Sequence, residues 1–150
     1  MKQSSFPLHF REQVPLAPYT TLGIGGPARY FAEAETEEHV AEALEFAGVR
    51  NLPVFILGGG SNIVASDSGF SGLVLHIALR GIKSRNDDVI TAAAGEDWDS
   101  FVRICVERRL SGIECLSGIP GTVGGTPVQN VGAYGQEVSD VILSVRAWIA

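Results

Sequence analysis

Short apolar runs between turn-forming residues predict a chain of mixed strands and helices. We expect strands at residues 28–34, 53–57, 72–77 and 89–94, where apolar residues run together between turn formers. Residues 138–149 run apolar with some alternation and predict a further strand. Prolines break up residues 1–18, so we expect an irregular lead-in on the surface there.

A first helix is predicted by its cap and its charges. Thr36 is a typical N-cap, and Glu37 and Glu38 place negative charge in the first turn. Gly48 can close the segment, so we expect a helix at residues 37–47. Its inward side would carry Val40, Leu44 and Ala47.

A second helix is predicted after Asp97, which can act as its N-cap. It would run from residue 98 to about residue 110 and end before Gly112. One side would be an amphipathic stripe at helical spacing, made of Trp98, Phe101, Val102, Cys105, Val106 and Arg109.

A polar stretch from Arg80 to Asp88, with turn character at its end, divides the chain. We therefore expect an α+β fold with mixed sheets in two small lobes. The expected segments are the lead-in at 1–18, a first lobe at 19–80 and a second lobe at 81–150.

The charge distribution favours small soluble substrates over nucleic acid or membranes. The net charge is −6 and the basic residues are scattered, whereas polyanions require a concentrated basic face. Cys105 and Cys115 lack a CxxC spacing and stand in or near apolar runs, so we expect reduced, partly buried thiols and a cytoplasmic location. Prolines in the first residues argue against a leader, and no apolar run approaches the roughly 20 residues of a membrane span.

The densest glycine cluster is Gly118–Gly135, where glycines and prolines rule out one continuous helix or central strand. Glycine permits positive φ and close approach, so several N–H groups could turn toward one anion. Thr122 and Thr126 add hydroxyls, and Gln129 and Asn130 add amides. This set suits a ligand with phosphates and a flat ring. The alternative is a buried connection whose glycines only permit turns.

The first glycine cluster along the chain is Gly58–Asn62, which follows the strand predicted at 53–57, and Gly118–Gly135 is the second. Three glycines, a serine and an amide can form another anion cradle for the same backbone reason. The lysine and the spacing of a P-loop are lacking. A triple glycine alone is a weak signal, and the two clusters strengthen each other only if the fold brings them together.

Residues 19–28 contain a formal GxGxxA match, the pattern of a Rossmann turn. Pro18 precedes the match, Pro27 lies inside it, and a strand rather than a helix is expected to follow. We therefore reject the Rossmann interpretation and expect a corner of threonine and glycine.

Catalytic side chains are hard to find. His9, His39 and His76 have no paired ligand spacing, so we expect no metal site. Glu114 and Glu137 flank the Gly118–Gly135 cluster and could act as general acids or bases, although a lone carboxylate is more often a capping or salt-bridging group. A redox cofactor would supply the missing reactive atoms.

Several motifs, in this order and spacing, resemble the flavin-binding part of the bacterial UDP-N-acetylenolpyruvoylglucosamine reductase family, also called UDP-N-acetylmuramate dehydrogenases. They are Thr20–Ala28, Ile56–Asn62, Ala94–Trp98, Gly112–Glu114 and, most specifically, Gly118–Gly135. The resemblance implies a PCMH-type FAD-binding fold of the vanillyl-alcohol-oxidase kind, with two α+β lobes around a non-covalently held FAD.

The resemblance also implies which residues contact FAD, with Gly58–Asn62 and Gly121–Thr126 holding the pyrophosphate. The full set that it implies is Leu57, Gly58, Gly59, Gly60, Ser61, Asn62, Ile119, Pro120, Gly121, Thr122, Val123, Gly124, Gly125, Thr126, Gln129, Asn130, Gly132, Ala133, Tyr134 and Glu137.

In the family, NADPH reduces the flavin, which passes hydride to UDP-N-acetylglucosamine enolpyruvate and yields UDP-N-acetylmuramate for peptidoglycan synthesis. A serine, an arginine and a glutamate assist, and in the family they follow the region that this chain resembles. We therefore expect the amino-terminal portion of a longer enzyme, without the substrate domain and inactive alone. The resemblance implies a monomer at full length.

Two other functions stay open. Another flavoprotein of the same fold would be favoured by a histidine or cysteine placed for covalent flavin attachment, and neither glycine cluster contains one. A non-catalytic nucleotide-binding module is the second alternative. Bound yellow cofactor would separate that module from both flavoproteins.

Overall fold

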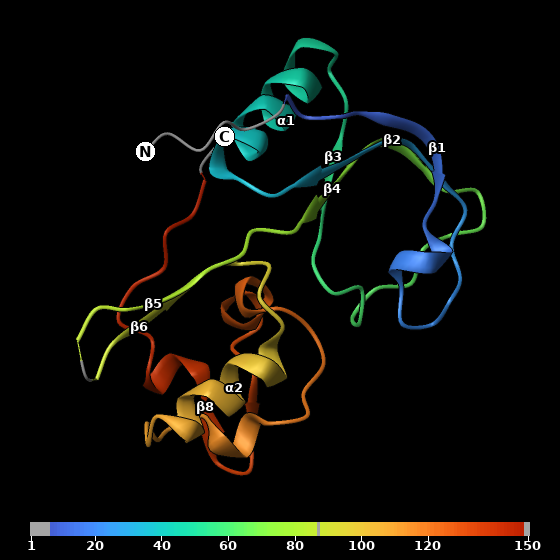
Figure 1. Cartoon of the computed structure of the whole chain (residues 1–150). Coiled ribbons are helices and arrows are strands. Elements are labelled where there is room, and N and C mark those ends of the chain that lie inside the picture. The colour runs from blue at the N-terminus through green and yellow to red at the C-terminus, as the bar shows by residue number, and fades with distance from the viewer. Residues whose placement is uncertain (1–6, 87, 149–150) are drawn as a thin grey trace. The chain divides into compact units, whose positions relative to one another are not determined.

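The computed structural model describes residues 7–86 and 88–148 (Figure 1). The chain divides into two compact units, Met1–Leu79 and Arg80–Ala150. Each unit has its own apolar clusters and is described by itself. The first residues of the expected lead-in, Asp87 of the expected turn, and the end of the strand expected at 138–149 lie outside the described residues.

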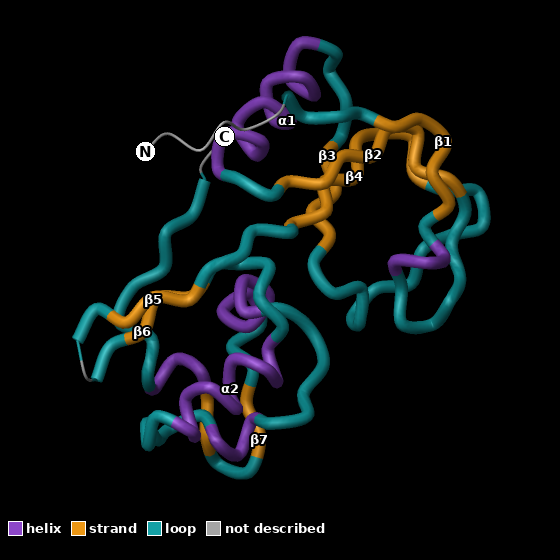
Figure 2. The backbone as a smooth tube through the Cα atoms, in the orientation of Figure 1, coloured by secondary structure: helices purple, strands orange, loops and turns teal. Residues whose placement is uncertain are grey.

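The first unit is built on a four-stranded sheet with strand order β1-β2-β4-β3 (Figure 2). The strands are β1 (Arg11–Pro15), β2 (Pro27–Ala34), β3 (Val54–Leu57) and β4 (Phe70–Ile77). β2 pairs antiparallel with β1 and parallel with β4, and β3 also pairs parallel with β4. The sheet is therefore mixed, as expected for an α+β fold.

Successive side chains on a strand point to opposite faces of a sheet, and in this sheet both faces are covered by apolar clusters. Helix α1 (Glu37–Val49) packs Ala43 and Ala47 onto one face, in a cluster with Ala32 of β2. Phe31 points into the other cluster, which also holds Leu57. Leu57 thereby fixes the end of β3, where the first glycine cluster begins.

The cap predicted for α1 is confirmed, since the Thr36 hydroxyl oxygen accepts a hydrogen bond from the His39 N–H at 3.2 Å. The helix runs past Gly48 to Val49, two residues beyond the expected end. Of the residues expected inside, Ala47 is buried, whereas Val40 and Leu44 are half-buried.

The second unit combines helix α2 (Trp98–Glu107) with short hairpins and 3₁₀ turns. The hairpins are β5 (Ile82–Ser84) with β6 (Ile90–Ala92) and β7 (Gly132–Ala133) with β8 (Gln136–Glu137). The 3₁₀ turns are η2 (Glu114–Leu116), η3 (Val123–Val128) and η4 (Val138–Asp140). Their common core contains Trp98, Val102, Cys105, Ile113, Leu116, Val131 and Val138.

The N-cap predicted for α2 is confirmed, since the Asp97 carboxylate accepts from the Ser100 N–H at 2.9 Å. The helix ends at Glu107, earlier than expected, and Arg109 adopts a positive φ of 60°. Val106 is 50% exposed, so the amphipathic stripe is narrower than predicted.

Two secondary-structure predictions are wrong, and one strand was not predicted. Residues 11–15 of the expected lead-in form β1, with a further 3₁₀ turn (Ala17–Tyr19) after it, and Leu8 and Leu16 are buried. The stretch expected to separate the lobes contains the unpredicted strand β5. Residues 138–149 do not form a strand in their described part: η4 comes first, and residues 141–148 follow as an exposed segment outside any ladder.

Candidate functional site

The first glycine cluster lies at the carboxyl end of β3, in the first unit. Leu57 is 1% exposed and belongs to the core, so it supports the loop from beneath. Gly58 and Ser61 are half-buried, and Gly59 and Asn62 are exposed. The front of the loop, at Gly59 and Asn62, is therefore accessible, and its base at Leu57 is fixed by the sheet.

Gly60 must be glycine for a reason internal to the fold. Its φ is +68°, and a Cβ there would lie 1.9 Å from the carbonyl oxygen of Tyr19. The Gly60 carbonyl accepts a hydrogen bond from the Thr21 N–H at 3.0 Å. The loop is therefore seated against the threonine corner expected at residues 19–28.

That corner is held by Thr20, whose side chain is buried. Its hydroxyl donates to the Ile24 carbonyl at 2.8 Å and accepts from the Ile24 N–H at 3.2 Å. Strand β2 begins at Pro27, and no helix follows. Rejection of the Rossmann turn is thus confirmed, because a phosphate-binding helix N-terminus is not formed here.

The second glycine loop, Gly121–Thr126, is held to residues 94–98 by backbone hydrogen bonds of the second unit. The Val123 N–H donates to the Glu96 carbonyl and the Gly124 N–H to the Ala94 carbonyl, each at 2.9 Å. The Gly125 N–H donates to the Thr122 carbonyl at 2.9 Å. These three N–H groups are used by bonds within the second unit, so fewer donors face outward than the glycine pattern indicated.

Two loop features fit an approaching phosphate. Thr122 and Asp97 form an antiparallel bridge of the type without mutual hydrogen bonds, so the Thr122 N–H points away from the supporting segment. Among the described residues, no hydrogen bond uses the N–H of Gly121 or Thr122. A Cβ at Gly125 would have only the Thr122 Oγ1 near it, at 3.8 Å, so space above Gly125 is open.

Other implied contacts of this region differ in exposure. Thr126 is 6% exposed and its hydroxyl donates to the Val123 carbonyl at 2.9 Å, which makes it a support of the loop. Ile119 packs on the core of the second unit, and Ala133 does the same. Pro120 and Gln129 are exposed.

The hairpin of β7 and β8 presents Tyr134 at its tip, 93% exposed. Tyr134 and Gly135 have φ values of 53° and 83°, the signs of a type I′ turn. Tyrosine is unusual at such a position because its Cβ crowds the backbone. An exposed aromatic ring held in an unfavourable conformation is a feature typical of a binding site.

Asp99 is a supporting residue of the candidate site that sequence reasoning missed. Its Oδ1 accepts from the Ser117 hydroxyl and the Gly118 N–H, both at 2.7 Å, and so anchors the entrance to the second glycine cluster. The Ser117 hydroxyl, followed by the Gly118 N–H, lowers the pKa of the Asp99 carboxyl below its ordinary value. No sequence signal distinguished it from an ordinary acidic residue in a first helical turn.

The two carboxylates considered as general acids are engaged in local bonds. The Glu114 Oε2 accepts from the Gly112 N–H at 2.5 Å, and hydrogen bonds from its own backbone N–H and then that of Gly112 lower the Glu114 pKa. The Glu137 Oε2 accepts from the Asn130 side-chain amide at 2.7 Å. The lowered pKa favours the charged form of Glu114 over a proton donor.

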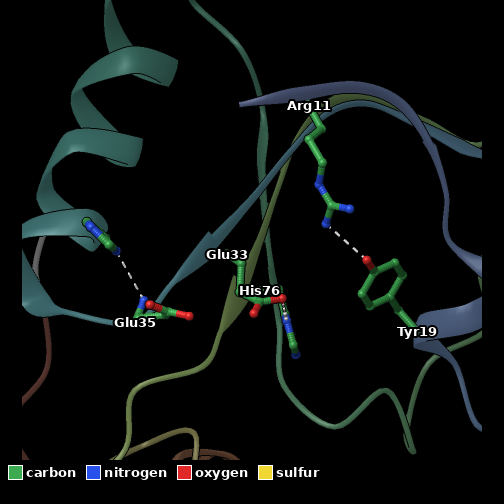
Figure 3. A network of polar contacts seen from close by, with 6 residues as sticks. Arg11, Tyr19, Glu33, Glu35 and His76 are labelled. Atoms are coloured by element: carbon green, nitrogen blue, oxygen red, sulfur yellow. Dashed lines mark hydrogen bonds and ion pairs between the residues drawn. The ribbon is translucent and has the colours of Figure 1, made fainter. Parts of the chain in front are cut away.

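His39 and His76 of the first unit have separate partners (Figure 3). His76 Nδ1 lies 3.0 Å from the Glu33 Oε2, and His39 Nδ1 accepts from the Glu35 N–H at 3.3 Å. Beside them, Arg11 donates to the Tyr19 hydroxyl at 3.0 Å. Across residues 7–86 and 88–148, no three histidine, cysteine or acidic side chains gather in a way that could hold a metal ion.

Both cysteines are free thiols. Cys105 is buried, and burial raises its pKa, whereas Cys115 is exposed rather than partly buried as expected. Among the described residues, no helix has both the length and the apolar character needed to span a membrane.

The comparisons with known proteins agree on one family. The model of the FAD binding domain family matches residues 28–150. A UDP-N-acetylenolpyruvoylglucosamine reductase from Saccharopolyspora erythraea is 54% identical over 134 residues, which make up 87% of this chain and 37% of that protein. One from Cutibacterium acnes is 47% identical over 141 residues, or 91% of this chain and 38% of that protein.

A solved structure gives the same result. The crystal structure of UDP-N-acetylenolpyruvylglucosamine reductase from Thermus caldophilus matches with a TM-score of 0.73 and 33% identity, covering 89% of this chain and 46% of that one. The chain spans less than half of the length of the curated relatives it matches. The PCMH-type fold and the resemblance inferred from the motifs are confirmed. Since the family model matches most of its length, the chain belongs to the FAD-binding domain family, with UDP-N-acetylenolpyruvoylglucosamine reductases among its relatives.

Proposed function

We propose that this chain binds FAD without a covalent bond and forms the FAD-binding part of an NADPH-dependent UDP-N-acetylenolpyruvoylglucosamine reductase. The observation that carries the proposal is the family match over residues 28–150 together with relatives of that one name at up to 54% identity. The product of such an enzyme, UDP-N-acetylmuramate, is a precursor of peptidoglycan. A cytoplasmic location and a monomeric full-length enzyme are part of the proposal.

The two glycine loops are the proposed contacts of the FAD pyrophosphate. Support comes from the open space above Gly125 and the outward Thr122 N–H in one loop, and from the accessible front of Gly58–Asn62 in the other. Backbone N–H groups near a phosphate stabilise its charge without requiring a cationic side chain. Exposed Tyr134 is a proposed contact toward the flavin.

The chemistry divides between the cofactor and the protein. When bound, FAD would accept hydride from NADPH and deliver it to the enolpyruvyl double bond. The residues of this chain would bind and orient it, and Asp99 would hold the entrance of the second loop in place. The charged state favoured at Glu114 and the local bond of Glu137 to Asn130 support leaving proton donation to residues beyond the described site.

The test is to purify the chain, release any bound ligand by heat and identify it by mass. We expect FAD, in near-equimolar amount, and no NADPH-dependent reduction of UDP-N-acetylglucosamine enolpyruvate by the chain alone. Turnover by the chain alone would contradict the expectation that catalytic residues are missing. A different released nucleotide, with no uptake of added FAD, would favour the nucleotide-binding module.

A further inference from the structure

Asn130, between η3 and β7, uses both ends of its side-chain amide within the second unit. Its Nδ2 donates to the Glu137 Oε2 at 2.7 Å, and its Oδ1 accepts from the Ser139 N–H at 3.1 Å. Its φ of 45° lies in the left-handed region, which asparagine tolerates better than most residues. The amide is therefore engaged by the fold at both ends, at a residue with an unusual backbone conformation.

Glu137 completes the same network. Its carboxylate accepts from the Asp140 N–H in a capping box, and the Ser139 hydroxyl lies 3.5 Å from the same Oε2 that Asn130 contacts. The Glu137 N–H donates to the Asp140 Oδ2 at 3.3 Å. This carboxylate thus joins the turn after η3 to the first turn of η4.

The backbone on either side of this network leads directly to the glycine loop. The Val131 N–H donates to the Thr126 carbonyl and the Val138 N–H donates to the Val131 carbonyl, each at 3.0 Å. Residues 130 and 137 therefore stand where the end of η3 and the base of the β7–β8 hairpin meet. A change in their contact would reorient both features together.

We propose that Asn130 and Glu137 are positioning residues that clamp η3 and the hairpin in the orientation that binds FAD, and that their side chains do not contact the flavin themselves. The part of this inference that is tested by FAD affinity rests on the proposed FAD binding. It replaces the direct flavin contacts that the family resemblance implied for these two side chains, because the Asn130 Nδ2 and Oδ1 and the Glu137 carboxylate already have partners within the second unit.

The test exchanges the two functional groups. Asn130→Asp sets two carboxylates against each other, beside Asp140, and we expect FAD affinity to fall about tenfold or more. Glu137→Gln keeps an oxygen acceptor for the Asn130 amide and should cost only about two- to threefold. The double variant N130D/E137Q restores one amide and one carboxylate with reversed roles, so we expect recovery to within about threefold of the wild type.

Amide hydrogen exchange supplies a readout that needs no FAD. We expect exchange at the Ser139 N–H to be about tenfold faster in Asn130→Asp and to return toward the wild-type rate in the double variant. Asn130→Gly keeps the left-handed backbone without the amide, and should also speed exchange, which separates the side chain from backbone strain. Thermal unfolding confirms that each variant is folded.

A double variant that regains slow exchange but not FAD affinity would overturn the proposal. The lost affinity would then come from direct flavin contacts of the Asn130 and Glu137 side chains, since the clamp itself would be restored. Unchanged exchange in Asn130→Asp or Asn130→Gly would also overturn it, because the clamp would not hold. Failure of the wild type to bind FAD would instead contradict the proposed function, while exchange at Ser139 would still decide whether the clamp exists.

Discussion

Two adjacent glycines of the second loop should respond in opposite ways to the same substitution. Gly124→Ala places a Cβ 2.6 Å from the Ala94 Cβ and 3.0 Å from its Cα and carbonyl oxygen. Gly125→Ala places a Cβ with only the Thr122 Oγ1 near it, at 3.8 Å. The first change tests packing within the fold and the second tests the space left for a ligand.

The magnitudes follow from the distances. Non-bonded carbons pack at about 3.5–4.0 Å, so Gly124→Ala requires a shift of about 1 Å in a segment held by backbone hydrogen bonds. Such overpacking costs about 1–3 kcal/mol, a large fraction of the roughly 4–10 kcal/mol expected for a unit of this size. Gly125→Ala should leave stability unchanged or raise it by up to about 1 kcal/mol, since its φ lies outside the left-handed region.

For FAD affinity this order should be reversed, so that Gly125→Ala is the more harmful of the two substitutions. A methyl group at residue 125 occupies the space proposed for the pyrophosphate, so FAD affinity should fall at least about tenfold, or 1.4 kcal/mol. Thermal unfolding and fluorescence titration with FAD measure both quantities on the same samples. A Gly125→Ala protein that is stable and binds FAD as tightly as the wild type would refute the proposed approach of the pyrophosphate to this glycine.

Three further predictions concern the surroundings of the loop. Tyr134→Asn should raise the free energy of unfolding by about 1 kcal/mol, because asparagine suits a type I′ turn, and should weaken FAD binding in the same titration. Trp98→Phe should lower the free energy of unfolding in denaturant by about 1–3 kcal/mol, since the buried Nε1 donates to the Leu116 carbonyl at 3.0 Å. In the folded chain the pKa values of Asp99 and Glu114 are lowered from their ordinary values of 3.8 and 4.5. Above these ordinary values both carboxylates therefore stabilise the fold. This contribution is lost as the pH falls through the pKa values of the folded chain. Denaturant titrations from neutral to acid pH should therefore show a shallower loss of stability for Asp99→Asn and Glu114→Gln than for the wild type, and an unchanged slope would contradict the assignment.

Local signals allowed much of the fold to be predicted from the sequence. The caps Thr36 and Asp97 act through hydrogen bonds only three residues away, so their helices could be placed. Strand β1 could not be predicted, because Arg11–Pro15 is mostly polar and becomes a strand only by pairing with β2. Residues 138–149 show the reverse case: the apolar run indicates a strand, but a strand needs a partner, and the described part of this run has none.

The candidate site was predictable in position but not in detail. Glycine clusters mark where the backbone can approach a ligand, yet Gly60 and Gly124 are required by contacts with Tyr19 and Ala94. Only the three-dimensional arrangement shows that space is left open above Gly125. Nor could residue types reveal that Asn130 is engaged by Glu137, since that contact joins side chains seven residues apart that the fold brings together.

The central claim is that this chain binds FAD, and an equilibrium titration of the ligand-free chain tests it most directly. Flavin fluorescence and calorimetry should both show saturable, equimolar binding of FAD, with FMN binding far more weakly because it lacks the pyrophosphate linkage that the two loops are proposed to hold. A folded chain that binds neither flavin, or that binds FMN as tightly as FAD, would contradict the account.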